Sequence, residues 1–177
     1  MTYLIVSDTH GRRDRLEEVV RRNPGADGLL FLGDGLRDTE EVRTMFAGRT
    51  WEAVKGNCDS FFLNSSGNSG VTEELFLTLG EYHILMMHGH THGVKGDPER
   101  VVRYASERGA DVLLYGHTHI AQENYYPAGT RLQDGYCLPG ALYVFNPGSL
   151  GEPRGGKPSY GVMELRRGGI LLSHGTL

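Results

Sequence analysis

Two histidines separated by one residue, His117 and His119, are the feature of this sequence with the clearest chemical potential. They follow the apolar run Val112–Tyr115, which predicts a buried strand that ends at Gly116. A neutral imidazole is a ligand for manganese, iron, nickel or zinc. For an isolated pair, a turn that carries two partly solvated histidines is an equally good interpretation, so the rest of the chain has to decide.

Four further polar segments follow short apolar runs in the same way: Asp8-Thr9-His10, Gly33-Asp34, Gly56-Asn57 and His88-Gly89. Open α/β sheets place their sites beyond the carboxyl ends of the strands, so we expect these side chains to meet at one edge. Mixed nitrogen and oxygen ligands suit manganese, iron, nickel or zinc better than calcium. An amide ligand is unusual in a structural zinc site, where Cys and His prevail, and this favours catalytic metal chemistry.

Each segment also has a simpler structural explanation. Asp8 could be the N-cap of a following helix, and Asp34 and Asn57 could be turn residues. A single dipeptide therefore decides nothing. The prediction of a metal-binding cleft depends on the same arrangement, a polar group after a strand, recurring five times in one chain.

The elements that must carry these groups alternate between strands and helices, which predicts an α/β fold. The expected strands are Tyr3–Val6, Leu29–Leu32, Trp51–Val54, Thr72–Leu79, Tyr82–Met87, Val112–Tyr115, Ala141–Phe145, Tyr160–Leu165 and Ile170–Ser173. The expected helices are Arg12–Arg22, Thr39–Phe46 and a helix that Asp97 caps and that runs to Arg108. A hairpin around Gly80-Glu81 indicates two packed sheets, whereas Asn64–Gly70 and the stretch after His119 are expected to be loops.

The composition predicts one globular domain over residues 1–177, with 38% hydrophobic and 23% charged residues. The formal net charge of −4 gives no general attraction to nucleic acid or to an anionic membrane. No apolar run approaches the roughly 18 residues of a membrane span. The two cysteines form no disulfide framework and the N-terminus enters a strand directly, so we expect a cytoplasmic protein without membrane contact.

The ordered set D-x-H, G-D, G-N, H-G and G-H-x-H resembles the calcineurin-like metallophosphoesterase superfamily. More closely, G-N-C-D-S (Gly56 to Ser60) and N-P-G-S (Asn146 to Ser149) resemble its small bacterial and archaeal phosphodiesterase branch. The resemblance implies a two-sheet β-sandwich flanked by helices, which is a four-layer αββα fold. It also implies a binuclear-metal-dependent phosphoesterase, more a phosphodiesterase than a phosphomonoesterase, in which a metal-bridging hydroxide attacks a small phosphodiester in line.

The resemblance assigns the ligands of two divalent ions per chain. One ion would be held by Asp8, His10, Asp34 and His119, and the other by Asp34, Asn57, His88 and His117, with the Asp34 carboxylate bridging the two. We expect manganese first, with nickel, iron or zinc as alternatives. The second G-H-T-H, at residues 89–92, is not a ligand motif, although its His90 could face the substrate phosphate as a donor of a hydrogen bond or a proton. We expect His92 to be solvated.

The sequence departs from the wider superfamily at the position where many members have a histidine that helps to protonate the leaving oxygen. Cys58 stands there, and a thiol with an ordinary pKa of about 8.5 suits that role poorly. The general acid is therefore His90, or the natural leaving group needs little help. For Cys58 itself we favour a small packed residue over a redox group. The N-P-G-S segment would present backbone N–H groups to the cleft, and residues 151–157 would either add a cation beside the phosphate or form a surface loop.

Two alternatives to a small-molecule enzyme remain. The first is a protein-binding scaffold of the same fold with residual metal binding, as in a eukaryotic retromer subunit that resembles this branch but lacks part of the ligand set. The second is a nuclease, but a long nucleic acid is disfavoured because the net charge is acidic and the sequence shows no evident basic groove for the phosphates. We therefore expect a small phosphoester as the partner. The oligomeric state, including a homo-oligomer, stays open.

Overall fold

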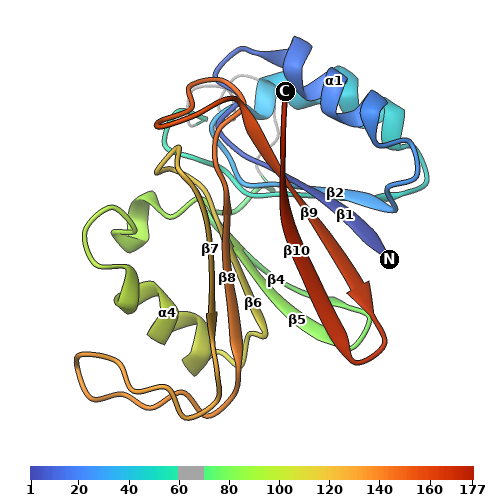
Figure 1. Cartoon of the computed structure of the whole chain (residues 1–177). Coiled ribbons are helices and arrows are strands. Elements are labelled where there is room, and N and C mark those ends of the chain that lie inside the picture. The colour runs from blue at the N-terminus through green and yellow to red at the C-terminus, as the bar shows by residue number, and fades with distance from the viewer. Residues whose placement is uncertain (60–69) are drawn as a thin grey trace.

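The computed structural model describes residues 1–59 and 70–177, so the predicted loop Asn64–Gly70 lies outside the described residues apart from Gly70. Two five-stranded sheets form the centre of the fold (Figure 1). The first has the strand order β10-β9-β1-β2-β3 and the second the order β4-β5-β6-β8-β7. The predicted two-sheet sandwich with flanking helices is confirmed.

The strands of the first sheet are β1 (Thr2–Val6), β2 (Gly28–Phe31), β3 (Thr50–Ala53), β9 (Ser159–Arg166) and β10 (Gly169–Thr176). Those of the second are β4 (Glu74–Leu79), β5 (Tyr82–Met87), β6 (Val112–Tyr115), β7 (Ala121–Tyr126) and β8 (Leu142–Pro147). The helices are α1 (Arg13–Arg22), α2 (Thr39–Val42) and α4 (Pro98–Glu107), with 3₁₀ helices at Leu36–Asp38, Arg43–Phe46 and His90–His92.

Side chains along the inner strands point alternately to the two faces of each sheet, and this alternation produces the layers of the fold. In β1, Ile5 packs between the two sheets, whereas Leu4 faces the cluster that contains Leu16 of α1. In β5, Met86 packs between the sheets and Met87 lies in the cluster that contains the apolar side of α4. Because side chains alternate across a strand, each inner strand contributes to two cores at once. The order of layers is therefore helix, sheet, sheet, helix, and Figure 1 shows α1 and α4 on opposite outer sides.

The strands that precede the predicted ligands run parallel within their sheets. β1 pairs with β2 and β2 with β3 in parallel, and β5 pairs with β6 and β6 with β8 in the same way. The remaining strands, β4, β7, β9 and β10, pair antiparallel. The carboxyl ends of parallel strands lie at the same edge of a sheet, so each sheet delivers its polar segments to one rim.

Three expectations about the elements were wrong in part. The stretch after His119 is not only loop, because Ala121–Tyr126 forms the edge strand β7. It escaped prediction because an edge strand that is mostly exposed lacks the apolar alternation of a buried one. The predicted helix Thr39–Phe46 changes from α to 3₁₀ after Val42. Asn146 and Pro147 belong to the end of β8 rather than to a separate turn.

The cap of α4 agrees with the sequence, since the Asp97 carboxylate accepts a hydrogen bond from the Glu99 N–H at 3.0 Å. The alternative role of Asp8 as a helix cap is excluded, because Arg12 occupies the N-cap position of α1. Among the described residues, no helix is long and apolar enough to cross a membrane.

Candidate metal centre

The predicted ligand segments share an unusual backbone conformation. Among residues 1–59 and 70–177, the non-glycine residues with positive φ are Asp8 (54°), His10 (44°), Asp34 (58°), His117 (66°) and His119 (61°). All five belong to the predicted ligand set. Left-handed conformations are costly for residues with a Cβ atom, and they persist where the surrounding structure enforces them, commonly at functional sites. The folded chain therefore holds these loops in shapes that local preference would not choose.

Two glycines make room for these loops because they have no side chain. A Cβ atom on Gly56 would collide with the Asp34 carboxylate, and one on Gly116 would collide with the Ser7 hydroxyl beside Asp8. The glycines thus let two loop backbones approach the carboxylates closely. This explains why glycine precedes Asn57 and His117 in the sequence motifs.

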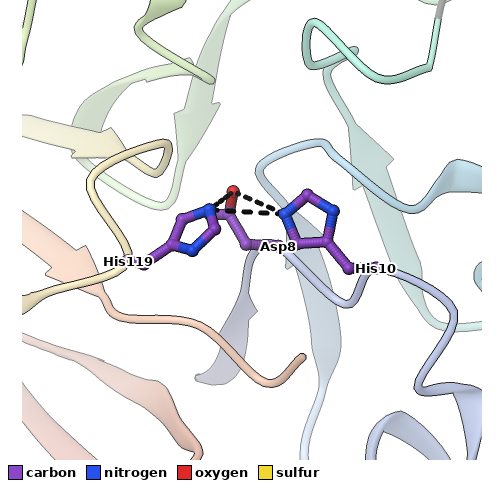
Figure 2. Close-up of side chains that lie close together, drawn as sticks. All are labelled: Asp8, His10 and His119. Carbon is purple, nitrogen blue, oxygen red and sulfur yellow. Dashed lines mark hydrogen bonds and ion pairs between the residues drawn. The ribbon is translucent and has the colours of Figure 1, made fainter. Parts of the chain in front are cut away.

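Asp8, His10 and His119 form the first group of converging side chains (Figure 2). The Oδ1 atom of Asp8 lies 3.0 Å from Nε2 of His119 and 3.7 Å from Nε2 of His10. The two Nε2 atoms are 3.3 Å apart. In Figure 2 the two imidazoles flank the carboxylate, with their Nε2 atoms facing its oxygen. The resemblance assigned these three residues to the same ion, and the structure brings them together.

Asp34, His88 and His117 form the second group. The Oδ2 atom of Asp34 lies 3.4 Å from Nε2 of His88 and 3.8 Å from Nε2 of His10, so Asp34 lies between the two groups. His88 is fully buried and its Nε2 also lies 3.9 Å from Asp8 Oδ1. The arrangement agrees with the predicted bridging position of Asp34.

Each of the two carboxylates has one oxygen bound by the protein and one that faces the histidines. Oδ2 of Asp8 accepts hydrogen bonds from the Ser7 hydroxyl and from the His117 N–H at 3.1 Å. Oδ1 of Asp34 accepts one from the Cys58 N–H at 2.7 Å. The remaining oxygens, Asp8 Oδ1 and Asp34 Oδ2, point toward the imidazole nitrogens.

Two of the histidines have a fixed tautomer. Nδ1 of His88 lies 2.7 Å from the Leu32 carbonyl oxygen, and Nδ1 of His119 lies 2.8 Å from the Glu152 carbonyl oxygen. A carbonyl oxygen only accepts, so both Nδ1 atoms carry a proton and both Nε2 atoms face the carboxylates. Metal-binding histidines are commonly oriented by such a second hydrogen bond.

In a neutral ring, an Nε2 lone pair would face a carboxylate oxygen at these distances, and a divalent cation between the two atoms would satisfy both. Among the described residues, the buried side-chain atoms without a hydrogen-bond partner are Asp8 Oδ1, His88 Nε2 and His90 Nδ1. Unpaired buried polar atoms are rare and costly, and two of these three face the centre of the ligand groups. The donor set of carboxylate and imidazole fits divalent transition metals, so the residues present suit the metal ions that the resemblance implies.

The charges of the groups depend on one another. Burial favours the neutral form of Asp8, but the neighbouring His10, His119 and His88 outweigh burial and hold the pKa of Asp8 well below its usual range. Burial also opposes the charge of Asp34, and His88 beside it lowers its pKa nevertheless. In return, Asp8 raises the pKa of His10, and Asp34 raises the pKa of His88 despite the burial of that ring. Burial and the nearby His88 lower the pKa of His117 to about 4.

His90 lies beside the second group. Its ring centre is 5.4 Å from that of His88 and 6.2 Å from that of His117, on the 3₁₀ helix His90–His92. Burial, together with the charge of His88, lowers the pKa of His90. A neutral ring is therefore the prevailing form near pH 7, which suits a donor of hydrogen bonds better than a store of protons. His92 is not simply solvated, because it contacts Glu74 at 3.3 Å and packs against Tyr104.

Asn57 and Cys58 follow β3 at the rim. Asn57 is exposed, and its amide nitrogen lies 3.2 Å from the Cys58 sulfur. The ligand role of Asn57 stays a prediction. The expectation that Cys58 is a packed residue was wrong, since its thiol is exposed and within 4.8 Å of ligand atoms of His10 and Asp34. Partial desolvation by the surrounding protein, together with the Asp34 carboxylate, raises the pKa of Cys58 to about 11, which keeps the thiol protonated.

The N-P-G-S segment does not offer its amides to the cleft as expected. The Asn146 amide nitrogen donates to the Gly116 carbonyl at 2.9 Å and to the Thr118 hydroxyl at 3.0 Å, and its Oδ1 accepts from the Gly148 N–H at 2.9 Å. Ser149 donates to the Asp8 carbonyl at 2.8 Å. The segment therefore supports the loops that carry Asp8 and His117 through hydrogen bonds to residues of those loops. The motif itself is visible in the sequence, but the contacts with Gly116, Thr118 and Asp8 span 28 to 141 residues and cannot be read from it.

The segment 151–157 has a related role. Besides the Glu152 carbonyl that binds His119, the Arg154 N–H donates to the His119 carbonyl at 2.9 Å. Arg15 of α1 donates to the carbonyl groups of Leu150 and Gly151 at the start of the segment. These contacts favour a fixed support for His119 over a detached surface loop.

Comparisons with known proteins agree with this geometry. A model of the calcineurin-like phosphoesterase superfamily domain matches residues 1–168. The chain is 35% identical over 167 residues to the probable metallophosphoesterase YsnB of Bacillus subtilis, covering 93% of this chain and 85% of that protein. It is 30% identical over 181 residues to the phosphodiesterase YfcE of Escherichia coli K12, covering 93% and 88%.

Solved structures share the fold. A predicted phosphoesterase from Streptococcus pneumoniae TIGR4 superposes with a TM-score of 0.72 and 26% identity, covering 99% of this chain and 88% of that one. Vps29 of Entamoeba histolytica complexed with Zn²⁺ superposes with a TM-score of 0.64 and 21% identity, covering 99% of both chains. At that identity, the second likeness concerns the fold alone.

Proposed function

This chain belongs to the calcineurin-like phosphoesterase superfamily, and from that premise we propose that it is a binuclear metal-dependent phosphoesterase that prefers small phosphodiesters. The observation that carries the proposal is the pair of ligand groups that meet at Asp34, with five members in left-handed backbone conformations. The name of the relative YfcE supports the preference for diesters.

Asp8, His10 and His119, with Asp34, would hold one divalent ion. Asp34, His88 and His117, with Asn57, would hold the other. We propose manganese as the first choice, with nickel, iron or zinc as alternatives. When bound, a metal pair supplies a hydroxide nucleophile at neutral pH and positive charge for the phosphoryl oxygens.

The protein's own residues have three tasks in this proposal. The Nδ1–H groups of His88 and His119 donate hydrogen bonds to the Leu32 and Glu152 carbonyls, and these bonds fix both rings so that their Nε2 atoms face inward. His90, neutral near pH 7, donates a hydrogen bond to a non-bridging phosphate oxygen. A protonated Cys58 thiol with a pKa of about 11 is a weak acid, so we propose that the natural substrate has a leaving group that departs with little protonation.

A protein-binding scaffold of the same fold is the competing proposal, and the fold likeness to Vps29 is its support. The filled ligand positions favour the enzyme, because function is argued from the site and not from the fold. The two proposals differ in turnover, since a scaffold needs none.

The test is hydrolysis of two chromogenic substrates, bis(p-nitrophenyl) phosphate and p-nitrophenyl phosphate, by metal-stripped protein refilled with Mn²⁺, Ni²⁺, Zn²⁺ or Mg²⁺. We expect metal-restored turnover with preference for the diester. His117→Ala removes a ligand of the second group and should abolish turnover. The matched control is His83→Ala, because His83 is an exposed histidine near the start of β5, whereas the ligand His88 follows the end of that strand. Full activity of His117→Ala would refute the site, and metal binding without any turnover would favour the scaffold.

A further inference from the structure

A buried carboxylate behind the ligand groups accepts hydrogen bonds from four backbone N–H groups. Asp59 is 3% exposed. Its Oδ2 accepts from the N–H groups of Asp34 and Gly56, both at 2.8 Å, and its Oδ1 accepts from Gly35 and Leu36, both at 2.9 Å. Among the described residues, no cationic side chain pairs with Asp59. The backbone dipoles of the two loops therefore provide the surroundings of this charge.

These bonds connect the loop after β2 with the loop after β3. Three of the donors are consecutive residues, Asp34, Gly35 and Leu36, which wrap around the carboxylate as a backbone nest. Asp34 has φ of 58° and Gly35 has φ of 143°. A buried N–H group without an acceptor is costly, so Asp59 stabilises a backbone shape that is otherwise disfavoured.

The same contacts determine which oxygen of Asp34 is available. While Asp59 binds the Asp34 N–H, the Cys58 N–H from the loop after β3 binds Asp34 Oδ1 at 2.7 Å. Each loop therefore holds the carboxylate of the other. The atom left over is Asp34 Oδ2, which faces His88 Nε2 at 3.4 Å and His10 Nε2 at 3.8 Å.

We propose that Asp59 is a positioning residue that aims the Asp34 carboxylate at the metal pair and keeps Asn57 in register with it. This inference rests on the proposed metal site and deepens it. Both oxygens of Asp59 already accept backbone N–H groups, so Asp59 would touch neither the metal ions nor the substrate. It acts on Asp34, which would bridge the two ions, and on Asn57, which would hold only the second, so its loss should weaken the ion of the second group more than the other ion.

The test is Asp59→Asn, which keeps the shape but turns one acceptor oxygen into an NH₂ group that faces backbone N–H donors. Titration calorimetry with Mn²⁺ measures both affinities, and electron paramagnetic resonance reports whether two Mn²⁺ ions are coupled. We expect one ion to bind within about threefold of the wild-type affinity and the other about 10–100-fold more weakly, the usual effect of losing a partner that orients a ligand. The coupled signal should give way to that of a single ion.

Asp27→Asn is the matched control, because Asp27 also accepts a backbone N–H, that of Thr2 at 2.6 Å, but far from the ligand groups. It should leave both affinities unchanged. Two ions bound by Asp59→Asn with wild-type affinities would overturn the inference. A wild-type protein that binds no metal would overturn the proposed function and this inference together, and it is recognised without any variant.

A measurement on the wild-type protein covers the case in which Asp59→Asn does not fold. Asp59 is the acceptor for the Gly35 and Leu36 amides in a loop, so hydrogen exchange of these two amides by NMR should be slow in the metal-free protein. Exchange at the rate of an open loop would overturn the inference.

Discussion

Replacing Asn146 by aspartate should separate the support of the ligand loop from the ligands themselves. The Asn146 side chain is fully buried, and its NH₂ group donates to the Gly116 carbonyl and to the Thr118 hydroxyl, on either side of His117. Aspartate has the same shape but no donor, so its carboxylate faces two acceptors. Each buried acceptor that loses its donor costs about 1–3 kcal/mol with the lost bond included, so two acceptors give a range of about 2–6 kcal/mol. We expect a total destabilisation of about 3–5 kcal/mol.

Urea denaturation of the metal-free protein measures this loss, and a thermal scan should show a Tm lower by roughly 6–20 °C for a chain of this size. Burial raises the pKa of the introduced carboxyl in the folded state, so its protonated form, which donates one bond, is favoured there. The deficit should therefore shrink as the pH falls toward about 5 and grow as the pH rises.

The control for this prediction is Asn124→Asp, the same chemical change on the edge strand β7. Asn124 is half-buried, and no hydrogen bond of its side chain is found among the described residues, so the change should cost less than about 1 kcal/mol. An Asn146→Asp variant that is no less stable than this control, at any pH, would refute the argument that Asn146 supports the ligand loop through its amide.

Three other predictions follow from the site. Gly116→Ala should cost about 1–3 kcal/mol in urea unfolding because its Cβ collides with the Ser7 hydroxyl, whereas Gly25→Ala, with open space around it, should be neutral. Metal affinity measured by calorimetry should fall as the pH is lowered from 8 to 6. The pKa values of His10 and His88 are raised, so protons compete with the metal for these rings at a higher pH than for an ordinary histidine. Equal affinities at the two pH values would contradict this. Free metal at 100 times its Kd should stabilise the folded protein by about 2.7 kcal/mol, so removing the metal with a chelator should lower Tm by roughly 5–11 °C. An unchanged Tm would argue against ions bound to the folded state.

The sequence predicts the ligands better than it predicts what holds them. The candidate ligands Asp8, Asp34, Asn57, His88 and His117 could be proposed because each follows a parallel strand, and the geometry of parallel sheets then sends them to one rim. The branch motif G-N-C-D-S extends to Ser60, which lies outside the described residues.

The supporting contacts could not be predicted in the same way. The Asp59 and Asn146 side chains bind backbone groups 23 to 30 residues away, and nothing in local composition marks such pairs. The left-handed conformation of Asp and His residues is also hidden, because local preference disfavours it and tertiary contacts impose it. The edge strand β7 was missed because its exposed residues have no apolar alternation.

The central claim is that two ions are held by two ligand groups that meet at Asp34. Anomalous diffraction at the manganese edge, from crystals grown with Mn²⁺, tests it most directly. We predict two peaks, one among Asp8, His10 and His119 and one among Asp34, His88 and His117. A single peak, or peaks away from these side chains, would contradict the account.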